Sequence, residues 1–261
     1  MLDAIFRVSD YLQYLMTANS RHGIHSPFVY SFYEKVIQSK EKSPYFDLIE
    51  TIRKKMIQSK VKIDFVDFGV GNKSGERRIS EIASTTAKNA KYGRLLYRLL
   101  HVFQPVYSLE LGTGSGITAM YQGAALNSER PLHSIEGSEK LAEIAAYNAR
   151  ECGIYENIIF HTGTFENVLP ELLQQMPRVD YAYIDGNHGF EPTIRYFEMI
   201  MEKVHEQSIL IFDDINWSEG MKRAWAVIKN DPRVQVSIDL FALGIVFLRK
   251  GQEKEHFTLR Y

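Results

Sequence analysis

Short hydrophobic runs recur along the second half of the chain and alternate with segments long enough to form a helix. The runs fall at residues 106–111, 131–136, 157–161, 179–185 and 208–213. Runs of this kind, bounded by turns, are typical of buried strands, and their alternation with helices predicts βαβ units. We therefore predict an α/β fold with a doubly wound, mostly parallel sheet that helices cover on both faces.

Both ends of the chain depart from this alternation. Strands predicted at 234–240 and 244–249 are separated by only a few residues, so they should pair as a C-terminal antiparallel hairpin. The first 90 residues carry apolar positions near helical spacing, which predicts a mainly helical N-terminal extension. Helices are expected near 5–16 and over 27–37, 45–58 and 91–103, with a short strand or hairpin at about 61–75. The predicted domains are residues 1–90 and 91–261.

Composition narrows the class of protein. Hydrophobic residues make up 45% and charged residues 24% of the 261 residues, as in a soluble globular protein. Cys152 is the only cysteine, which excludes an intramolecular disulfide and suits a reducing compartment. The start of the chain lacks a signal-peptide pattern, and no segment approaches the ~20 apolar residues needed to cross a bilayer. We expect a cytoplasmic protein without a membrane partner.

Charge is distributed unevenly along the chain. The first 100 residues hold 17 Lys and Arg against 10 Asp and Glu, whereas residues 101–261 hold 14 against 22. A basic segment could contact acidic substrates or nucleic acid. The basic residues are scattered, so we favour the simpler interpretation of a solvated helical surface.

A glycine-rich turn follows the first strand of the α/β region. The segment YSLELGTGSG at 107–116 places Gly112, Gly114 and Gly116 between an apolar strand and a helix. Glycines let a backbone turn sharply and bring its N–H groups close to a ligand. A dinucleotide-binding fingerprint would require glycine at position 117, where the chain has Ile117. The short turn, preceded by the acid Glu110, instead suits a ligand without a pyrophosphate but with a cationic amino acid portion.

Glu136 supplies a second acid at the same edge of the predicted sheet. It ends the next strand, 20 residues after Gly116. A carboxylate in this position can accept hydrogen bonds from both hydroxyls of a ribose. The alternative for the glycines is a purely structural turn. A second glycine cluster, at 67–72, is better explained as a hairpin turn.

Residues 92–249 resemble a class I S-adenosylmethionine-dependent methyltransferase with a Rossmann-like fold, particularly the small-molecule O-methyltransferase branch that includes catechol and caffeoyl-CoA methyltransferases. Residues 110–116 match the first motif of that family, and Ile135-Glu136 its ribose-binding acid. Family members often contact the adenine amino group through an acid after the third strand, where this chain has Thr164. The resemblance implies that the residues binding S-adenosyl-L-methionine are Glu110, Gly112, Thr113, Gly114, Ser115, Gly116, Glu136, Gly137, Thr164 and Asp185.

Acidic residues follow two later strands. Asp185 ends the strand at 179–185, and Asp213, Asp214 and Asn216 follow the other. If these strands are neighbours, their oxygen atoms gather at one edge of the sheet and suit Mg²⁺ or Ca²⁺. The resemblance implies a divalent metal at Asp185, Asp213 and Asp214, although metal-dependent relatives carry Asp-Asn where this chain has Asp213-Asp214. The alternative is that these carboxylates cap helices.

His188 lies three residues after Asp185, where catechol-type enzymes place a basic lysine. An imidazole with an unperturbed pKa of ~6.5 could take the proton from an acceptor hydroxyl near neutral pH. The alternative is a histidine that is hydrogen-bonded within a turn. We predict His188 and Asp185 as catalytic residues in a direct methyl transfer to the oxygen of a small-molecule acceptor.

Other functions make different predictions. Ile117 argues against a nicotinamide-dependent oxidoreductase, and the turn at 185–188 lacks the Pro-Pro-aromatic platform of enzymes that methylate nucleic-acid bases. A non-catalytic cofactor-binding domain and an RNA-directed methyltransferase stay open. The stretch RHGIHSPF at 21–28 could line an acceptor pocket, bind an anion, or simply connect two helices. The N-terminal helices could also pack on a partner chain in a homodimer.

Overall fold

The computed structural model describes residues 2–20, 23–66 and 75–261. It divides into two compact units, of which unit 1 comprises Met1–Glu34 with Arg178–Tyr261 and unit 2 comprises Lys35–Pro177. The domain boundary predicted at residue 90 falls inside unit 2, between α4 (Ile79–Thr86) and α5 (Ala90–Phe103). Each unit has its own hydrophobic core and its own set of paired strands.

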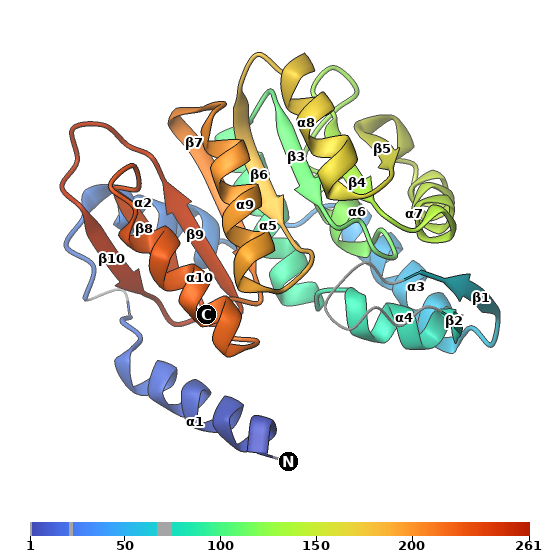
Figure 1. Ribbon diagram of the computed structural model, residues 1–261, viewed down its shortest axis with the longest axis horizontal. Coiled ribbons are helices and arrows are strands. Elements are labelled where there is room, and N and C mark those ends of the chain that lie inside the picture. Colours follow the sequence, from blue (N-terminus) through green and yellow to red (C-terminus); the bar gives the residue numbers. More distant parts are fainter. Residues whose placement is uncertain (1, 21–22, 67–74) are drawn as a thin grey trace. The chain divides into compact units, whose positions relative to one another are not determined.

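Unit 2 contains three parallel strands in the order β3-β4-β5 (Figure 1). They are β3 (Ser108–Leu111), β4 (Leu132–Glu136) and β5 (Ile158–Thr162), and they confirm the strands predicted at 106–111, 131–136 and 157–161. All four residues of β3 are buried, as expected for a strand covered on both faces.

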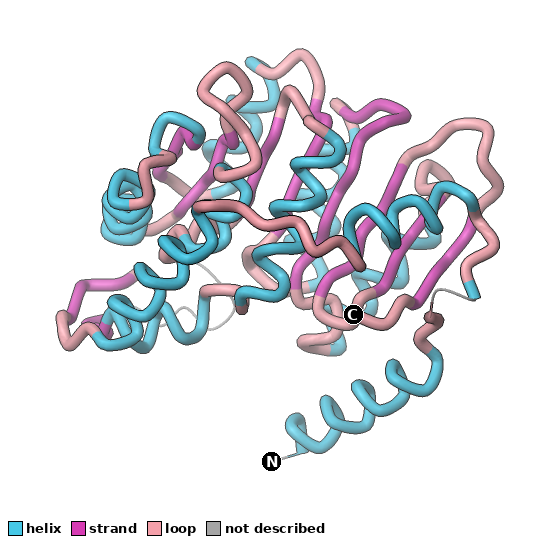
Figure 2. The backbone as a smooth tube through the Cα atoms, turned by 180° about the vertical axis from the view of Figure 1, so that it is seen from behind, coloured by secondary structure: helices cyan, strands magenta, loops and turns pink. Residues whose placement is uncertain are grey.

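Helices cover both faces of these strands. The helices α6 (Ile117–Gly123) and α7 (Glu139–Glu151) contact one another and the strands, and α8 (Phe165–Gln175) contacts β4. Figure 1 shows α8 in front of the strands and α6 behind them, and Figure 2 gives the opposite view. The alternation of strand and helix predicted from the sequence is therefore present in unit 2.

The N-terminal part of unit 2 is helical, as predicted. The helix α3 (Tyr45–Gln58) has the predicted bounds, and α5 begins at the N-cap Asn89, whose side chain accepts hydrogen bonds from two backbone N–H groups. The strands β1 (Lys62–Phe65) and β2 (Gly75–Arg78) pair as the predicted antiparallel hairpin. The glycine cluster at 67–72 lies outside the described residues.

Unit 1 contains five strands in the order β10-β8-β9-β7-β6. The strands β6 (Val179–Ile184) and β7 (Val204–Asp213) are parallel, whereas β9 (Leu243–Phe247) runs antiparallel to β7. The predicted C-terminal hairpin is confirmed, because β8 (Val236–Asp239) pairs antiparallel with β9. An edge strand that the sequence did not predict, β10 (Glu255–Thr258), runs parallel to β8.

The helices of unit 1 pack on these strands. The helices α9 (Phe190–Met201) and α10 (Glu219–Asn230) lie in front of the strands in Figure 1. The predicted helix at 27–37 is present as α2 (Pro27–Phe32) followed by a π-helical turn (Tyr33–Ile37), and Phe28 and Phe32 pack edge-to-face on Phe247. The first helix, α1 (Leu2–Thr17), is joined to the C-terminus because the Tyr14 hydroxyl donates to the Leu259 carbonyl.

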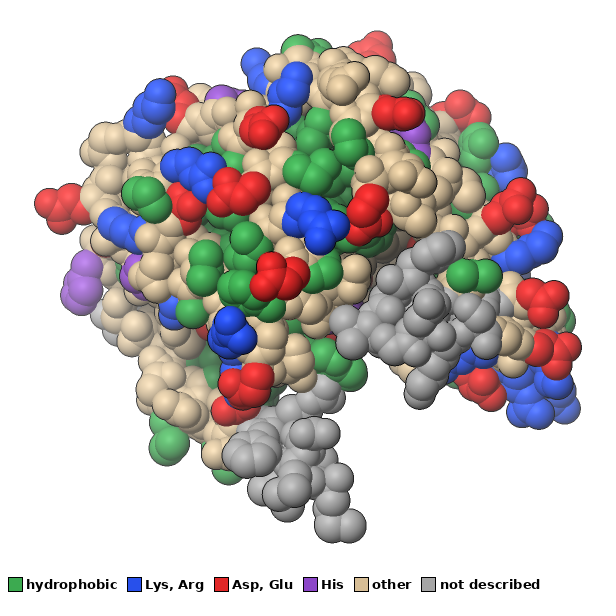
Figure 3. Space-filling view, in the orientation of Figure 1, with side chains coloured by type: hydrophobic (Ala, Val, Ile, Leu, Met, Phe, Trp, Pro, Cys, Tyr) green, Lys and Arg blue, Asp and Glu red, His purple; other side chains and the backbone are tan. Residues whose placement is uncertain are grey.

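Two surface properties bear on the predicted partners. No helix within the described ranges is both long and apolar enough to span a membrane. On the face shown in Figure 3, the Lys and Arg side chains are interspersed with Asp and Glu.

Candidate functional site

The glycine turn of unit 2 has a backbone that requires glycine. Gly112, Gly114 and Gly116 have φ values of 99°, 54° and 82°, in the region that L-residues with a side chain rarely adopt. The N–H groups of Gly112 and Thr113 both donate to the Ile135 carbonyl, which attaches the start of the turn to β4. The three closely spaced glycines are therefore explained by backbone conformation.

Two of these glycines also lie against neighbouring elements. A Cβ on Gly116 would be 2.8 Å from the Cα of Ala145 in α7, which is closer than real contacts allow. A Cβ on Gly114 would be 3.3 Å from the Thr86 side chain, which must then yield by a few tenths of an ångström. The turn is thus packed closely by α7 on one side and by the end of α4 on another.

Glu136 binds the backbone of the turn directly. Its two carboxylate oxygens accept hydrogen bonds from the N–H groups of Gly114, at 2.7 Å, and Ser138, at 2.9 Å. The carboxylate is only partly buried. The structure therefore brings the predicted ribose-binding acid beside the glycine turn. The hydrogen bonds of Glu136 hold its side chain and the turn together.

Glu110 lies on the opposite side of the turn, inside the core. Its side chain is completely buried and accepts hydrogen bonds from Ser134 and from Gln122 on α6. Burial is the main reason that the pKa of Glu110 is raised to about 8. The negative charge of Glu136 acts in the same direction, whereas the two hydrogen bonds lower the pKa and partly offset the rise. Both oxygens of this acid are occupied by groups of the chain itself.

The remaining cofactor-binding candidates of unit 2 lie in the same turn or directly after β4 and β5. Ser115 is buried in the turn, and its hydroxyl has no hydrogen-bond partner among the described residues. The carbonyl of Ser115 accepts a hydrogen bond from Asn148 of α7. Gly137 directly follows Glu136, and Thr164 is the partly buried N-cap of α8, without a side-chain capping bond.

In unit 1, the structure brings His188 close to two acids. The Nε2 atom of His188 lies 3.5 Å from the carboxylate of Asp185 and 4.0 Å from that of Asp214. The Tyr183 hydroxyl donates to the second oxygen of Asp185. The predicted pair of Asp185 and His188 is therefore adjacent in the structure.

The loops that carry this cluster have unusual backbone conformations. Asn187 and Asp214 have φ values of 50° and 51°, although neither is glycine. Left-handed conformations of this kind cost free energy and are concentrated at functional sites. Asn and Asp tolerate them best, because their short side chains can hydrogen-bond locally. The strain thus occurs on both strand-end loops at which we predicted chemistry.

The three acids predicted as metal ligands are not assembled as a set. Among the residues that the structure describes, no three His, Cys, Asp or Glu side chains are grouped closely enough to hold a metal ion. Asp213 ends β7 with 1% of its surface exposed, while the neighbouring Asp214 turns toward His188.

Some residues around the site were missed by the sequence analysis. Gln122 and Ser134 hold Glu110, yet neither belongs to a motif. Trp217 follows Asp214 and is 53% exposed, and its backbone N–H donates to the Asp214 carbonyl. A large exposed aromatic beside a strained loop is a recognisable signal, but only once the exposure is known.

Comparison with known proteins agrees with this arrangement. Residues 109–215 match a model of the methyltransferase domain family. This segment is similar to methyltransferase domains. The matched segment includes the glycine turn and Glu136 of unit 2 together with Asp185, His188 and Asp214 of unit 1.

One curated relative of this chain is the "Catechol O-methyltransferase" of Niastella koreensis. It is 25% identical over 124 residues, which cover 47% of this chain and 55% of that protein. The match therefore spans about half the length of the relative.

Solved structures share the fold over a larger part of the chain. An O-methyltransferase from Bacillus cereus in complex with SAH has a TM-score of 0.58 at 17% identity, covering 84% of this chain and 96% of that one. An O-methyltransferase from Streptomyces achromogenes in complex with SAM has a TM-score of 0.57 at 17% identity, covering 85% and 95%. The chain thus has the Rossmann-like α/β fold that the sequence predicted.

Proposed function

We propose that this chain transfers a methyl group from S-adenosyl-L-methionine to a hydroxyl oxygen of a small molecule. The observation that supports the cofactor most strongly is the turn of Gly112, Gly114 and Gly116, which Glu136 holds through a backbone N–H group. The O-methyltransferase names of the curated relative and of the solved neighbours support the reaction.

The residues of unit 2 fit the proposed cofactor. The turn carries no side chain at Gly114 and Gly116, and the buried Ser115 hydroxyl is without a partner among the described residues. Glu136 would hold the ribose, and the backbone of the turn would approach the amino acid portion. S-adenosylmethionine supplies an electrophilic methyl group when it is bound.

Glu110 has a positioning role in this proposal. Because its side chain is completely buried and hydrogen-bonded to Ser134 of β4 and Gln122 of α6, it orients β3, β4 and α6 around the turn. This role differs from the direct contact with the cofactor that the resemblance implied.

His188 acts as the general base on the acceptor. The imidazole takes the proton of the acceptor hydroxyl, and the carboxylates of Asp185 and Asp214 stabilise the resulting positive charge. Asp185 also orients the ring, since it lies nearest to Nε2. No step is assigned to a divalent metal, because Asp185, Asp213 and Asp214 do not form a ligand set.

Titration calorimetry with S-adenosylhomocysteine tests the cofactor. We expect micromolar binding to the native chain and no binding of NAD. Substituting Glu136→Gln should weaken binding of S-adenosylhomocysteine at least tenfold, whereas Glu139→Gln, an exposed glutamate three residues later, should change it less than twofold. Failure of the native chain to bind S-adenosylhomocysteine would overturn the proposal.

The same titration addresses the other functions that the sequence left open. Repeating it with Mg²⁺ and with EDTA shows whether a divalent metal contributes to binding or turnover. Cofactor binding without turnover on a broad panel of hydroxylated acceptors would indicate a non-catalytic domain. Salt-dependent binding of RNA would favour an RNA-directed enzyme.

A further inference from the structure

A pocket of about 510 Å³ lies on unit 1, away from the residues used by the proposed reaction. Its volume is in the range of small-molecule sites. It is formed by part of the stretch at 21–28 that the sequence singled out and by the connection between β9 and β10. The lining residues are His25, Ser26, Pro27, Phe28, Arg249, Lys250, Gly251, Gln252, Glu253 and Glu255.

Arg249 is fixed within this pocket. Its guanidinium carbon lies 4.0 Å from the centre of the Phe28 ring, a stacking contact that attracts a cation to the aromatic face. Its Nε atom donates to the Gln252 side chain at 3.1 Å. No carboxylate in the described part of the chain forms an ion pair with Arg249, so its terminal amino groups keep their donor capacity.

Gln252 connects the guanidinium to the rest of the pocket. Its amide nitrogen donates to the hydroxyl of Ser26, which is 4% exposed, and to the carboxylate of Glu255. Arg249 donates to the Gln252 oxygen, and the Gln252 amide nitrogen in turn donates to Glu255, so the hydrogen bonds of this series run in one direction. Arg249 is therefore held at two points, the Phe28 ring and the Gln252 oxygen, before any ligand arrives, which lowers the entropic cost of binding.

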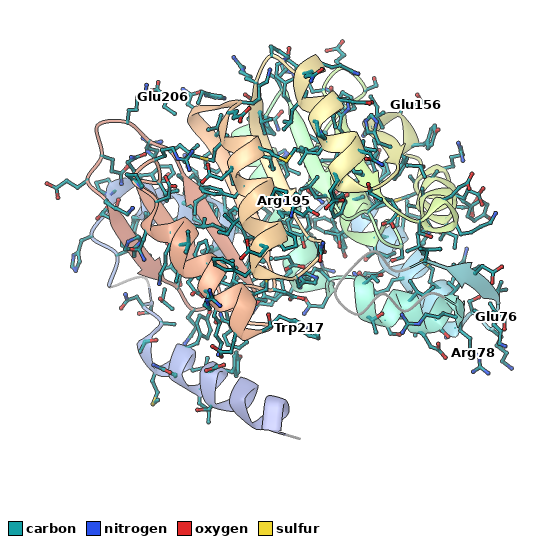
Figure 4. The ribbon with its side chains drawn as sticks, in the orientation of Figure 1. Glu76, Arg78, Glu156, Arg195, Glu206 and Trp217 are labelled. Atoms are coloured by element: carbon teal, nitrogen blue, oxygen red, sulfur yellow. The ribbon has the colours of Figure 1, made fainter. Side chains whose placement is uncertain are left out.

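The pocket lies at the other end of the unit 1 strands from the acid and histidine cluster. Asp213 at the end of β7 pairs with Leu243 at the start of β9, and Phe247 at the end of β9 pairs with Ile209. Arg249 therefore lies beyond the end of β9 that is remote from Asp213. Figure 4 shows these two ends of β7, with Glu206 near one and Trp217 just beyond the other.

The charges in the pocket indicate what it binds. Arg249 and Lys250 are adjacent cations that form no ion pair within the described ranges. Of the two acids, Glu255 is engaged by Gln252, and Glu253 is exposed. A planar guanidinium with both terminal groups available matches the oxygens of a phosphate or carboxylate, and a neighbouring lysine adds a second positive charge.

We propose that this pocket binds the phosphate or carboxylate group of a small molecule through Arg249 and Lys250. The bound oxyanion takes hydrogen bonds from the terminal amino groups of Arg249, and the Phe28 ring holds the guanidinium from behind. The pocket is a second ligand site, independent of the methyl acceptor site at His188. It gives residues 25–28, the part of the stretch at 21–28 that lines the pocket, a role that the proposed methyl transfer does not use.

Titration with inorganic phosphate and, separately, with succinate tests the proposal. The readout is the Nε–H signal of Arg249 in nitrogen-15 NMR, assigned by its loss in the Arg249→Gln variant. We expect a saturable shift of this signal with at least one of the two probes. The probe that binds more tightly identifies the ligand group as phosphate or carboxylate. If neither probe shifts the signal, the proposal is overturned.

Variants separate the pocket from general surface charge. Calorimetry should show at least tenfold weaker binding of the preferred probe to Arg249→Gln and about threefold weaker binding to Lys250→Gln, an exposed position that does not endanger folding. Arg195→Gln, which removes an exposed arginine of α9, should change the affinity less than twofold. Equal losses in all three variants would show nonspecific attraction and overturn the proposal.

The proposal can fail independently of the proposed methyl transfer. Arg249→Gln should bind S-adenosylhomocysteine as tightly as the native chain, because the variant lies outside the glycine turn. A variant that loses the anion and keeps S-adenosylhomocysteine supports the second site. A native chain that binds S-adenosylhomocysteine but neither phosphate nor succinate contradicts the second site alone.

Discussion

The glycine turn of unit 2 and the acid and histidine loops of unit 1 are built in different ways. In the turn, backbone conformation dominates, because three glycines have positive φ values and one of them has no room for a Cβ. In the loops, side chains dominate, and the positive φ values occur at Asn187 and Asp214. The glycine turn is therefore defined by its backbone conformation, and the loops are defined by the chemistry of their side chains.

This difference explains why one part is more general than the other. A backbone that must turn sharply against a helix can be made by few sequences, so it suits a cofactor shared by many enzymes. Side chains on strand-end loops can be exchanged without changing the strands, so they suit the part that differs between acceptors. Changes in the turn should therefore affect folding and cofactor binding together, whereas changes in the loops should affect turnover alone.

The largest effect is expected for Gly116→Ala. The added Cβ would lie 2.8 Å from the Ala145 backbone, and the residue must keep a φ of 82°. We expect a loss of about 3 kcal/mol in the free energy of unfolding and loss of S-adenosylhomocysteine binding. Urea unfolding and calorimetry measure the two effects.

Gly153→Ala is the matched control for this change. Gly153 has a φ of 73° but nothing within 4 Å of an added Cβ, so it isolates the cost of the left-handed conformation, about 1 kcal/mol. If both variants lost the same stability, packing of α7 against the turn would not be what makes Gly116 necessary.

The same difference shows what the sequence could predict. The glycine turn, the strands at 179–184 and 208–213, and the C-terminal hairpin follow from period and turn chemistry, which are local properties. The strand β10 was missed because it begins within the charged segment 253–255 and its four residues gain their pairing only from β8. An edge strand of this length depends on a neighbour that is distant in the sequence.

The site was predictable to a similar extent. Asp185 and His188 are adjacent in the structure because three residues separate them in one turn. To predict that Asp214 lies near His188 would have required knowledge of the strand order. The burial of Glu110 was not visible in the motif, because a glutamate before a glycine turn has the same sequence whether it points into the core or toward a ligand.

His188→Gln tests the side-chain part of the comparison. The amide keeps a similar size and hydrogen-bonding ability but cannot act as a base near neutral pH. We expect kcat to fall about 100-fold on an acceptor identified by the panel, with unchanged binding of S-adenosylhomocysteine. Stopped assays and calorimetry measure the two quantities.

His205→Gln is the control, since His205 also lies beside a carboxylate, at 2.7 Å from Asp180, but at the start of β7. It should leave kcat within a factor of two. Similar losses in the two histidine variants would remove the reason to place the base at His188.

Glu110→Gln tests the buried acid. Burial raises the pKa of Glu110 to about 8, so between pH 4.5 and 8 the folded state holds a proton that the unfolded chain releases. The stability of the native protein should therefore fall as the pH rises through this window. The glutamine variant avoids the cost of the charge, and we expect it to be more stable than the native chain by about 2 kcal/mol at pH 9.

Cofactor affinity decides between the two roles of Glu110. If the residue positions the turn, Glu110→Gln should bind S-adenosylhomocysteine within about threefold of the native affinity, because glutamine can keep the contacts with Ser134 and Gln122. A loss of 100-fold would instead mean that its charge contacts the amino acid portion of the cofactor. Denaturant melts at pH 5, 7 and 9 and calorimetry at pH 7 provide both measurements.

The smallest effect is expected from a histidine pair on neighbouring strands of unit 2. His133 Nδ1 and His161 Nε2 lie 3.0 Å apart, and burial, with a smaller contribution from His161, lowers the pKa of His133 to about 4. The unfolded chain therefore binds more protons than the folded one between pH 4 and 6.5, and stability should decline on acidification through this window. Because the pair is partly exposed, solvent reduces the effect to about 1 kcal/mol.

His133→Gln should flatten this pH dependence of stability in urea unfolding at pH 4.5 and 7, whereas His101→Gln, on an exposed position of α5, should preserve it. An unchanged slope in His133→Gln would assign the acid sensitivity to other groups of the chain.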